Sequence, residues 1–598
     1  NQSAERKVTF LTVDLIKNNP TQQIIGTKLI AYQDKQSQYF EFFPARGFQS
    51  AMYVPITIGL RGKEQIDSLR IIWPDAKTQL LTNIKADLIL TPEYPKATSV
   101  YSYAVPKEKT FFESVSSIDW KHSPVDTVDF KRQLLLPKMF SYSGPRIAKG
   151  DVNGDGLEDI YLCGPRHQAG ALFMQKKEGD FQFVRNHAFN VDKESQDEDA
   201  VFFDSDADGD LDLYVVSGGY LFSKDSPLLQ DRLYINDGKG NFNKSTSALP
   251  VEAAAGSCVA VLDVNGDGKS DLFIGGAFIP GEYPLSSGSA LLISDGKGHF
   301  EKADNVEEIK SLSRVTDVKV VDLNNDKQQD LLVSLEWASI KVLINAKGVL
   351  VDKTTDWFPK QQEGWWSRLL AEDFDGDGDI DLIAGNYGLN GQFKSDSLHP
   401  ATLVYKDFNK DGQIDPFFSY YIGDTAYPYA SRDEALGQVG MLRPRFPDYT
   451  TYSSATLETI FKKEELEGTE NLQAYQLQST YFESRNGKFV SHELPTQAQF
   501  APVYAMVALD VDQDGDQDII LGGNDNQARV RIGKTDANKG ILLLNDGKGN
   551  FTYVPQFICG LNFSGDVRDL ITVSGAKGIK LITGTNGEKV LTHQLSAK

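Results

Sequence analysis

Nine-residue loops rich in carboxylates are the part of this sequence best suited to chemistry. In the loop that begins at Asp204, carboxylates stand at positions 1, 3, 5 and 9 and glycine stands at position 6. Such a loop would repel itself unless it held a cation, and ligands that are all oxygen favour Ca²⁺. A worn copy begins at Asp322 and has Lys327 where the others have the turn glycine. The regular pattern also begins at Asp151, Asp263, Asp373 and Asp510.

A related loop begins at Asp407, so the sequence predicts about six or seven bound Ca²⁺ ions. The loops at Asp204, Asp373 and Asp510 have four carboxylates and the turn glycine and are expected to bind most tightly. Lys327 is expected to weaken its loop, because a left-handed residue other than glycine costs roughly 1–2 kcal/mol. The candidate metal-ligating residues are Asp151, Asn153, Asp155, Leu157, Asp159, Asp204, Asp206, Asp208, Asp210, Asp212, Asp263, Asn265, Asp267, Lys269, Asp271, Asp322, Asn324, Asp326, Asp330, Asp373, Asp375, Asp377, Asp379, Asp381, Asp407, Asn409, Asp411, Gln413, Asp415, Asp510, Asp512, Asp514, Asp516 and Asp518.

The residues after each loop distinguish these loops from EF-hands. An EF-hand needs a bidentate glutamate at position 12 and a helix on each side. Short apolar runs that end in glycine, such as DIYLCG and DLFIGG, follow the loops instead and predict buried strands. Each loop is therefore expected to join two strands. Position 12 of the five regular loops is Leu162, Val215, Ile274, Ala384 or Leu521, none of which is a ligand.

The loops recur with a period that predicts a repeat architecture. From Asp151 to Asp373 they begin 53, 59, 59 and 51 residues apart. Hairpin signals such as NDGKGN follow most loops, so each unit reads as four strands in roughly 50–60 residues. Seven such units predict an all-β chain built on a seven-bladed β-propeller. The seventh unit is expected to carry a metal-free copy of the loop at 561–569, with Asp569 at position 9.

Composition divides the chain into three parts. Residues 1–95 alternate apolar and polar residues between polar turns, which predicts a small β-sandwich or barrel. Residues 96–109 read as a linker and residues 110–598 as the propeller. The interval of 137 residues between the loops at Asp373 and Asp510 leaves room for an insertion at about 417–480. Within it, residues 455–467 have the spacing of one short helix.

The insertion and two adjacent tryptophans form the predicted ligand surface. Long insertions in compact folds tend to be functional, and aromatic residues and arginine are common at binding hot spots. The alternative is that these residues pack the insertion onto the propeller, because a long insertion needs a small core of its own. Stretches 386–390 and 533–537 are expected to line a funnel at the axis, opposite the metal loops. The candidate ligand residues are Trp365, Trp366, Tyr420, Tyr421, Tyr427, Tyr429 and Arg432.

Charge, cysteines and hydropathy exclude several classes of protein. The formal net charge of −22 argues against nucleic-acid binding by phosphate neutralisation. Cys163, Cys258 and Cys559 show no CxxC spacing and are expected to be buried small hydrophobic residues. No stretch is long and apolar enough to span a membrane. The chain begins at Asn1, so a signal peptide or lipid anchor is expected to have been removed or to lie upstream.

Several whole stretches resemble known families. The loops, in contexts such as GPRIAKGDVNGDGLEDIYLCG, resemble the FG-GAP/VCBS repeats of integrin α-subunit propellers. Residues 1–95, with GFQS and IIWPDA, are similar to the ASPIC/UnbV domain. The whole chain resembles the large VCBS-repeat surface proteins of Bacteroidetes. This resemblance implies a calcium-loaded propeller that is a lipoprotein on the extracellular face of the outer membrane or is secreted.

No catalytic constellation stands out in the sequence, which favours a protein that is not an enzyme. There is no HExxH pair, GxSxG elbow, P-loop or Rossmann fingerprint. Carboxylates bound to Ca²⁺ stay ionised and are poor general acids. The first hypothesis is therefore a non-catalytic, calcium-stabilised binding or assembly module at the cell surface. It would recognise a protein or glycan, as an accessory to an outer-membrane SusC/SusD-type nutrient-uptake complex.

The alternative hypothesis is a polysaccharide-active enzyme, resembling a lyase or dehydratase, on a calcium-loaded propeller. The feature that would favour it is a pocket at the propeller axis with a basic residue and a carboxylate or tyrosine that no metal binds.

Overall fold

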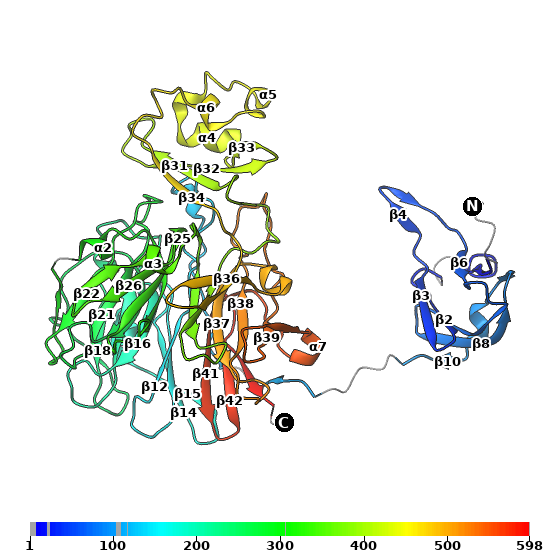
Figure 1. Ribbon diagram of the computed structural model, residues 1–598, viewed down its shortest axis with the longest axis horizontal. Helices are drawn as coiled ribbons and strands as arrows, with labels where there is room; N and C mark the ends of the chain where they lie inside the picture. Colours follow the sequence, from blue (N-terminus) through cyan, green and yellow to red (C-terminus); the bar gives the residue numbers. More distant parts are fainter. Residues whose placement is uncertain (1–7, 21–23, 103–108, 116–117, 305, 597–598) are drawn as a thin grey trace. The chain divides into compact units, whose positions relative to one another are not determined.

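The computed structural model describes residues 8–20, 24–102, 109–115, 118–304 and 306–596. The chain divides into two compact units, Asn1–Glu108 and Lys109–Lys598, and each is described by itself (Figure 1). Both units are built mainly from antiparallel strands.

Two sheets enclose the core of the first unit. Alternate residues, such as Leu11 and Val13 or Leu69 and Ile71, are fully buried in one cluster, as the two-residue period of a strand requires. The prediction of a small N-terminal β domain is confirmed. One sheet has the order β6 (Ile56–Gly59), β1 (Phe10–Val13), β9 (Leu88–Leu90). The other has the order β10 (Ser99–Val100), β8 (Lys77–Lys85), β7 (Gln65–Ile72), β2 (Lys28–Gln33), β3 (Gln36–Glu41), and β4 (Ala45–Gly47) pairs with β5 (Ser50–Ala51) as a separate hairpin.

Part of the predicted linker at 96–109 belongs to the first unit. Ser99 and Val100 form β10 and pair with Thr78 and Lys77 of β8, and Ala97 lies in the core cluster. An edge strand of two residues has no periodicity of its own, so the sequence pattern did not indicate it. Residues 103–108 of the predicted linker lie outside the described residues.

Seven sheets of four antiparallel strands make up most of the second unit. The first four sheets, from first to fourth strand, are β12 (Ile147–Gly150), β13 (Asp159–Leu162), β14 (Ala171–Gln175), β15 (Phe181–Val184); β16 (Asp197–Phe203), β17 (Asp212–Ser217), β18 (Arg232–Ile235), β19 (Asn243–Lys244); β20 (Gly256–Leu262), β21 (Asp271–Gly276), β22 (Ala290–Ser294), β23 (Phe300–Lys302); and β24 (Val315–Val321), β25 (Asp330–Ala338), β26 (Lys341–Asn345), β27 (Leu350–Asp352). The last three are β29 (Arg368–Glu372), β30 (Asp381–Gly385), β35 (Thr480–Ser484), β36 (Phe489–Glu493); β37 (Val503–Leu509), β38 (Asp518–Gly523), β39 (Ile541–Leu544), β40 (Thr552–Val554); and β41 (Asp566–Gly575), β42 (Gly578–Asn586), β43 (Leu591–Leu595), β11 (Phe112–Ser114). Strand β28 (Gly364–Trp365) pairs in addition with β25.

The first strands of these sheets contact one another in a closed series. The series runs β12, β16, β20, β24, β29, β37 and β41, and β41 contacts β12 again. The seventh sheet takes its fourth strand, β11, from the start of the unit, so both ends of the unit are held in one sheet. This arrangement is consistent with the blades of a propeller.

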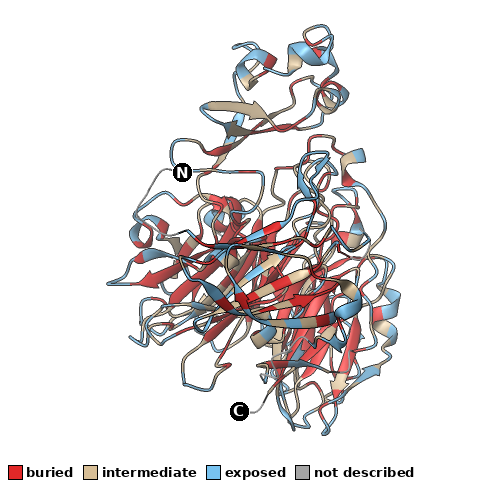
Figure 2. Ribbon diagram, turned by 90° about the vertical axis from the view of Figure 1, so that its right-hand side faces the viewer, coloured by how far each residue is buried: buried red, intermediate tan, exposed pale blue. Residues whose placement is uncertain are grey.

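Hydrophobic clusters lie between neighbouring sheets. Tyr161 of the first sheet packs with Leu213 of the second, and Phe273 of the third with Val333 of the fourth. Second strands such as β17 are buried along their whole length, and Figure 2 shows the buried residues following the strands of the sheets. Burial on both faces explains why these strands read as continuous apolar runs.

A further sheet interrupts the fifth one. Its order is β33 (Thr425–Pro428), β32 (Asp415–Ile422), β31 (Ala401–Lys406), β34 (Glu470–Ala474). It stands with α4 (Arg432–Gln438), α5 (Tyr449–Tyr452) and α6 (Leu457–Ile460) at one end of the unit (Figure 1). The insertion thus begins at β31 and not at residue 417, because the loop at Asp407 joins β31 to β32 and does not replace a hairpin of the fifth sheet. Of the predicted helix at 455–467 only α6 (Leu457–Ile460) is helical.

The short helices complete the second unit. Helix α4 was not expected from the sequence, although Ser431 and Glu434 form a capping box at its start. The α-helices outside the insertion are α1 (His187–Val191), α2 (Glu307–Lys310), α3 (Thr354–Trp357) and α7 (Gln556–Cys559). The 3₁₀ helices are η2 (Tyr94–Lys96) in the first unit and η3 (Asp129–Lys131), η4 (Pro227–Leu229), η5 (Gly440–Leu442) and η6 (Thr496–Gln499) in the second.

The seventh unit has no copy of the loop at 561–569, which corrects the predicted alignment. Asp569 lies inside the first strand, β41, and a tight turn at 575–578 joins that strand to β42. Asp569 instead pairs directly after a bulge of the first strand, as Asp199 and Asp317 do in the second and fourth sheets. A short Asp-rich match in a strand is easily mistaken for a loop when the loop itself is missing.

Candidate functional site

Seven cation loops are defined here as residues 151–159, 204–212, 263–271, 322–330, 373–381, 407–415 and 510–518. Six of them join the first strand of a sheet to its second strand, and the loop at 407–415 joins β31 to β32. The expectation that each loop connects two strands is confirmed. Every cation loop in the seven-sheet ring therefore lies at the same end of its sheet.

The backbone of each loop is folded around the carboxylate of its first residue. In the second loop, Gly209 has φ of 93° and its amide donates to Oδ2 of Asp204 at 3.1 Å. Lys327 takes the same left-handed place with φ of 67° and donates to Oδ2 of Asp322 at 2.9 Å. The worn copy thus keeps the loop geometry, with a lysine in a conformation that favours glycine.

The ninth residue anchors each loop to the sheet. Oδ2 of Asp381 accepts from the amide of Phe374 at 3.1 Å and from the hydroxyl of Tyr481 at 2.8 Å, and Oδ1 accepts from the amide of Ser484 at 2.7 Å. Asp381 is fully buried, and this burial raises its pKa to about 6. A cation beside the carboxylate would oppose that rise and favour the ionised form.

Three loops bring carboxylates together closely enough to hold a metal ion. The clusters are Asp204–Asp206–Asp208, Asp373–Asp375–Asp381 and Asp510–Asp512–Asp514, in each of which the possible ligand atoms lie within 4.8 Å of one another. These are the three loops expected to bind most tightly.

The first of these clusters also fits a cation by a second criterion. Oδ1 of Asp206 is buried and has no hydrogen-bond partner among the described residues. Burial and the neighbouring Asp208 raise the pKa of Asp206. An oxygen left in this state suits a hard divalent cation such as Ca²⁺, which all-oxygen ligands select. The loops at 151–159, 263–271, 322–330 and 407–415 carry asparagine at position 3 and offer an amide oxygen there in place of a carboxylate.

Side chains of the next sheet hold several cation loops in place. Nδ2 of Asn236, in the second sheet, donates to the carbonyl of Val152 in the first loop at 2.8 Å. Asn345 makes the same bond to Val264 at 2.8 Å, and Asn545 makes it to Phe374 at 2.7 Å. The loops are therefore part of the contact between neighbouring sheets.

A pocket of about 140 Å³ lies at the other end of the ring. Its walls include Ser257, Thr316, Ser367 and Tyr504, which lie at or near the start of the first strands, where those strands are farthest from the cation loops. Residues 137–140, 142 and 143 and Tyr429 of the insertion also line it. The name axial pocket is used for this cavity below.

The expected funnel stretches meet this pocket. Asn386 and Tyr387 from 386–390 line it, as does Thr535 from 533–537.

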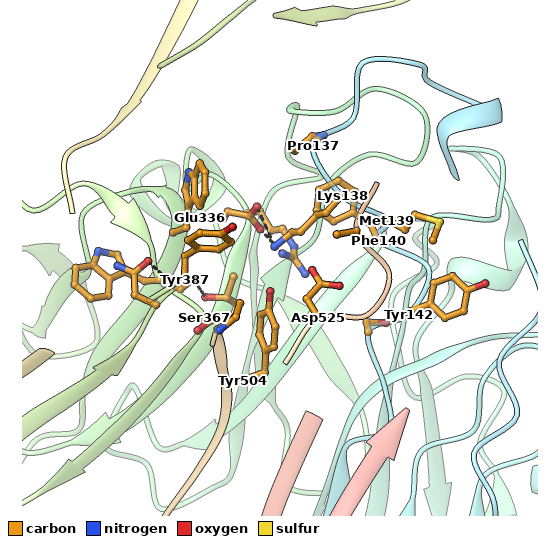
Figure 3. Close-up of a pocket in the computed structure, with 18 of the residues that line it drawn as sticks. Pro137, Lys138, Met139, Phe140, Tyr142, Glu336, Ser367, Tyr387, Tyr504 and Asp525 are labelled. Atoms are coloured by element: carbon orange, nitrogen blue, oxygen red, sulfur yellow. Dashed lines mark hydrogen bonds and ion pairs between the residues drawn. The ribbon is translucent and has the colours of Figure 1, made fainter. Parts of the chain in front are cut away.

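Charged groups converge inside the axial pocket. Figure 3 shows Lys138, Glu336, Asp525 and Tyr504 grouped at its centre. Glu336 pairs with Lys138 at 3.4 Å and with Arg314 at 2.5 Å. Burial opposes ionisation of Glu336, but these two cations outweigh it and hold its pKa below the usual value.

Two acids of the axial pocket have raised pKa values. Burial raises the pKa of Asp525, although Arg568 and Lys138 oppose the change. Burial also raises the pKa of Glu198 to about 7. Both carboxylates therefore hold protons at a higher pH than exposed acids do.

Aromatic residues form the other side of the axial pocket. The ring centroid of Trp365 lies 5.0 Å from that of Trp337 and 5.4 Å from that of Tyr387, both edge to face. Trp337 has φ of 68° although it is a bulky residue, a sparsely populated conformation that is typical of functional sites.

The two candidate tryptophans differ. Trp365 lines the axial pocket and is partly buried. Trp366 is fully buried between the fourth and fifth sheets, and its Nε1 donates to the carbonyl of Gln362 at 2.9 Å. Trp366 also belongs to the wall of the axial pocket, but its side chain has no exposed surface and packs in the core. Its role as a ligand residue stays a prediction.

The candidate residues of the insertion are also largely engaged in packing. Tyr429 is buried beneath the guanidinium of Arg531, 4.3 Å from its ring centroid, and Arg432 donates to the carbonyls of Phe446 and Pro447 at 2.9 Å each. Tyr420, Tyr421 and Tyr427 lie partly exposed on β32 and β33. Their role as a ligand surface stays a prediction.

Sequence reasoning did not find the polar residues of the axial pocket. Lys138 lies before the first sheet, Glu336 in the fourth, and Tyr504 and Asp525 in or after strands of the sixth. No motif links residues this far apart in the chain. The one sequence signal for the pocket was that stretches 386–390 and 533–537 follow the predicted second strands of their repeat units.

Comparisons with known proteins agree with the resemblance to two families. Residues 17–99 match the family described as ASPIC and UnbV, and residues 151–215, 220–274 and 322–384 match FG-GAP-like repeats. The comparison with curated proteins gives no match. In the described part of the chain, no helix is long and apolar enough to cross a membrane.

Several solved structures are similar to this chain at low identity. BBS1N in complex with ARL6DN has 11% identity and a TM-score of 0.37, covering 82% of this chain and 98% of its own. The V. cholerae biofilm matrix protein Bap1 has 11% identity and a TM-score of 0.34, with 82% and 92% covered. A Bacillus licheniformis rhamnogalacturonan lyase has 10% identity and a TM-score of 0.35, with 98% and 89% covered. Likenesses this weak support no statement about function.

Proposed function

We propose that this chain, an ASPIC and UnbV domain followed by FG-GAP-like repeats, is a calcium-stabilised, non-catalytic binding module built on a seven-bladed propeller. The observation that carries the proposal is that the two ends of the ring differ in the groups they present. Carboxylate loops stand at one end, where a cation would stiffen the contacts between sheets, and the axial pocket stands at the other. Binding sites in rigid folds commonly occupy such a concave, partly aromatic cavity.

The calcium is structural in this proposal. The seven cation loops would hold six or seven ions, of which the three carboxylate clusters are the strongest sites. Ions that bind only the folded chain stabilise it by mass action, by about 2.7 kcal/mol for one site at a hundred times its Kd. Thermal melts in millimolar Ca²⁺ and in EGTA at matched ionic strength test this part. An unchanged midpoint would contradict it.

The axial pocket is the proposed ligand site. Ala528 lines it and is only partly buried, so Ala528→Trp would fill it, whereas Ala253→Trp would place the same side chain at an exposed position. Both variants are applied to a glycan array and to a panel of cell-surface proteins in Ca²⁺. We expect a binding signal that Ala528→Trp abolishes and Ala253→Trp keeps. Signals that survive Ala528→Trp would place the site elsewhere, first of all on the partly exposed tyrosines of the insertion.

An extracellular position follows as part of the same proposal. Weak loops of this kind fill at the millimolar calcium found outside cells. We therefore propose a surface-exposed or secreted protein, anchored as a lipoprotein and working beside an outer-membrane nutrient-uptake complex of the SusC/SusD type. Fractionation of intact cells with and without surface proteolysis tests the position. Co-purification with outer-membrane transporters tests the partner.

One observation favours an enzyme as the second candidate. The axial pocket holds a basic residue, Lys138, together with Asp525 and Tyr504, none of which belongs to a cation loop. A polysaccharide-active enzyme needs such a set of acid and base groups. Incubation of the protein with a panel of polysaccharides, followed by measurement of new reducing ends and of unsaturated products, decides between the two. Product formation that Tyr504→Phe or Asp525→Asn abolishes would replace the binding proposal.

A further inference from the structure

We propose that the axial pocket binds a single ring of a neutral, hydroxyl-rich sugar. This inference rests on the proposed binding function and names the class of ligand for that site. Three features of the pocket support it: the balance of its charges, the kinds of polar group that remain available, and its aromatic wall and size.

The charges that line the axial pocket are compensated within the protein. Glu336 is matched by Lys138 and Arg314. Arg568 pairs with Asp566 at 3.4 Å, and Arg146 lies near the carboxylates of Asp569, Asp199 and Asp317.

Asp525, the remaining acid at the centre, is near both Arg568 and Lys138. A charged ligand would meet no uncompensated opposite charge here, and burying an unpaired ion is costly. The charge balance therefore favours a neutral ligand.

The polar groups of the axial pocket nevertheless offer both donors and acceptors. Lys138 is only partly buried and donates from an ammonium with three hydrogens, whereas Asp525 accepts through its carboxylate. Tyr504 can do both, and its ring lies near two cations, with Nζ of Lys138 5.7 Å and Cζ of Arg568 4.5 Å from the centroid.

Figure 3 shows Lys138, Asp525 and Tyr504 facing one another across the cavity. Neighbouring hydroxyls of a sugar are each donor and acceptor, so one ring can satisfy a donor and an acceptor at the same time.

The aromatic side and the volume set the size of the ligand. Trp365, Tyr387 and Phe393 pack edge to face along one side of the axial pocket, and the apolar C–H face of a sugar ring suits aromatic surface. The volume of about 140 Å³ is close to that of an engineered cavity of about 150 Å³ that binds benzene. The cavity is therefore matched to one six-membered ring, with further residues of a chain left outside.

The test uses the full chain in millimolar Ca²⁺ and three kinds of probe. Saturation-transfer NMR and calorimetry are run with the neutral sugars glucose, galactose, mannose and rhamnose, with the anion glucuronate and with the zwitterion glycine. Tyr504→Phe removes one hydroxyl and Lys138→Met removes the ammonium while keeping a long side chain. Lys239→Met, in an exposed hairpin far from the pocket in the chain, is the matched control. Melting curves of each variant confirm that it is folded.

We expect at least one neutral sugar to bind, with affinity reduced roughly three- to tenfold in Tyr504→Phe, as for the loss of one hydrogen bond, and unchanged in Lys239→Met. Binding of only glucuronate or only glycine, lost in Lys138→Met, would overturn the sugar assignment and leave the proposed binding site intact. Neutral-sugar binding that neither pocket variant weakens would also overturn it. If no probe binds and Ala528→Trp changes no signal on the arrays, the proposed function of the axial pocket as a ligand site is contradicted as well.

Discussion

The side-chain amide of Gln438 donates a hydrogen bond to Oδ1 of Asp415 at 2.8 Å. Asp415 is the ninth residue of the inserted cation loop and is fully buried, and Gln438 is the last residue of α4. Oε1 of the same glutamine accepts from the amide of Leu134 at 3.2 Å. One side chain therefore ties the inserted cation loop to the segment that leads into residues 137–140 of the axial pocket.

Replacement of Gln438 tests this tie. Gln438→Leu keeps the side-chain volume but leaves Oδ1 of the buried Asp415 and the amide of Leu134 without their partner. We expect the free energy of unfolding in saturating Ca²⁺ to fall by roughly 1–3 kcal/mol, the cost of an unsatisfied buried group. Urea unfolding measures it.

The control for this prediction is Gln392→Leu, since Gln392 is exposed and its side-chain amide donates to the hydroxyl of Tyr420. Equal effects of the two variants would show that the tie to Asp415 is unimportant.

The effect of Asp206→Ala on the melting temperature should depend on calcium. In the folded chain its Oδ1 is buried without a hydrogen-bond partner among the described residues, beside Asp208. Asp206→Ala removes a ligand in Ca²⁺ but removes repulsion and a desolvated oxygen in EGTA. We expect the melting temperature to fall in Ca²⁺ and to stay level or rise in EGTA. Asp536→Ala at an exposed position is the control, and a fall in both buffers would argue against a cation at this cluster.

Lys327 and Gly378 allow a reciprocal exchange between loops. Lys327 sits at φ of 67° and Gly378 at φ of 93°, both at position 6. A Cβ added at Gly378 would meet nothing within 4 Å, so Gly378→Lys tests the backbone conformation without a steric clash. We expect Gly378→Lys to lower stability by about 1–2 kcal/mol and Lys327→Gly to raise it by about 1 kcal/mol or less, since glycine also gains entropy in the unfolded chain. Chemical denaturation in Ca²⁺ measures both, and the same sign for both would refute the assignment.

The contact between the first and second sheets should depend on Asn236, in the hairpin that follows β18. Nδ2 of Asn236 donates to the carbonyls of Val152 and Leu211, and its Oδ1 accepts from the amide of Gly240 at 3.0 Å. Asn236→Ala leaves these buried groups unpaired, and we expect a loss of roughly 2–4 kcal/mol. Asn241→Ala in the same hairpin removes an exposed asparagine and should cost little. A similar loss in both would mean that the hairpin, and not the contact with Val152, is the sensitive element.

The sequence could predict features that repeat and missed features that occur once. The cation loops and the strands around them are short-range patterns: the position of Asp204 relative to Gly209 is enough to suggest the turn. The axial pocket joins Lys138, Glu336 and Asp525, whose approach depends on closure of the ring and leaves no local trace. Asp569 shows the opposite error, because its spacing resembles a loop although the residue lies inside β41. The sequence could not show whether Trp366 is buried or exposed, since aromatic residues occur both in cores and at binding sites.

Glu198 should make stability depend on pH near neutrality. It is 8% exposed in the wall of the axial pocket, and burial raises its pKa from 4.5 to about 7. The folded chain therefore keeps a proton between about pH 4.5 and 7 that the unfolded chain has released, so stability falls as the pH rises through this window. The size of this contribution is up to roughly 3 kcal/mol at 1.36 kcal/mol per pKa unit. Glu198→Gln keeps an acceptor for Nε2 of Gln196, whose bond to Oε1 of Glu198 is 2.8 Å, but cannot ionise.

We therefore expect Glu198→Gln to flatten the change in unfolding free energy between pH 5 and 7 and to be more stable than the unmodified chain above pH 7. Denaturation at a series of pH values in constant Ca²⁺ measures the slope. Glu301→Gln at an exposed position should leave the slope as it is. A slope that Glu198→Gln does not change would show that Glu198 is ionised in the folded chain throughout this range, held so by Arg314 and Arg146, the two cations that oppose the rise in its pKa.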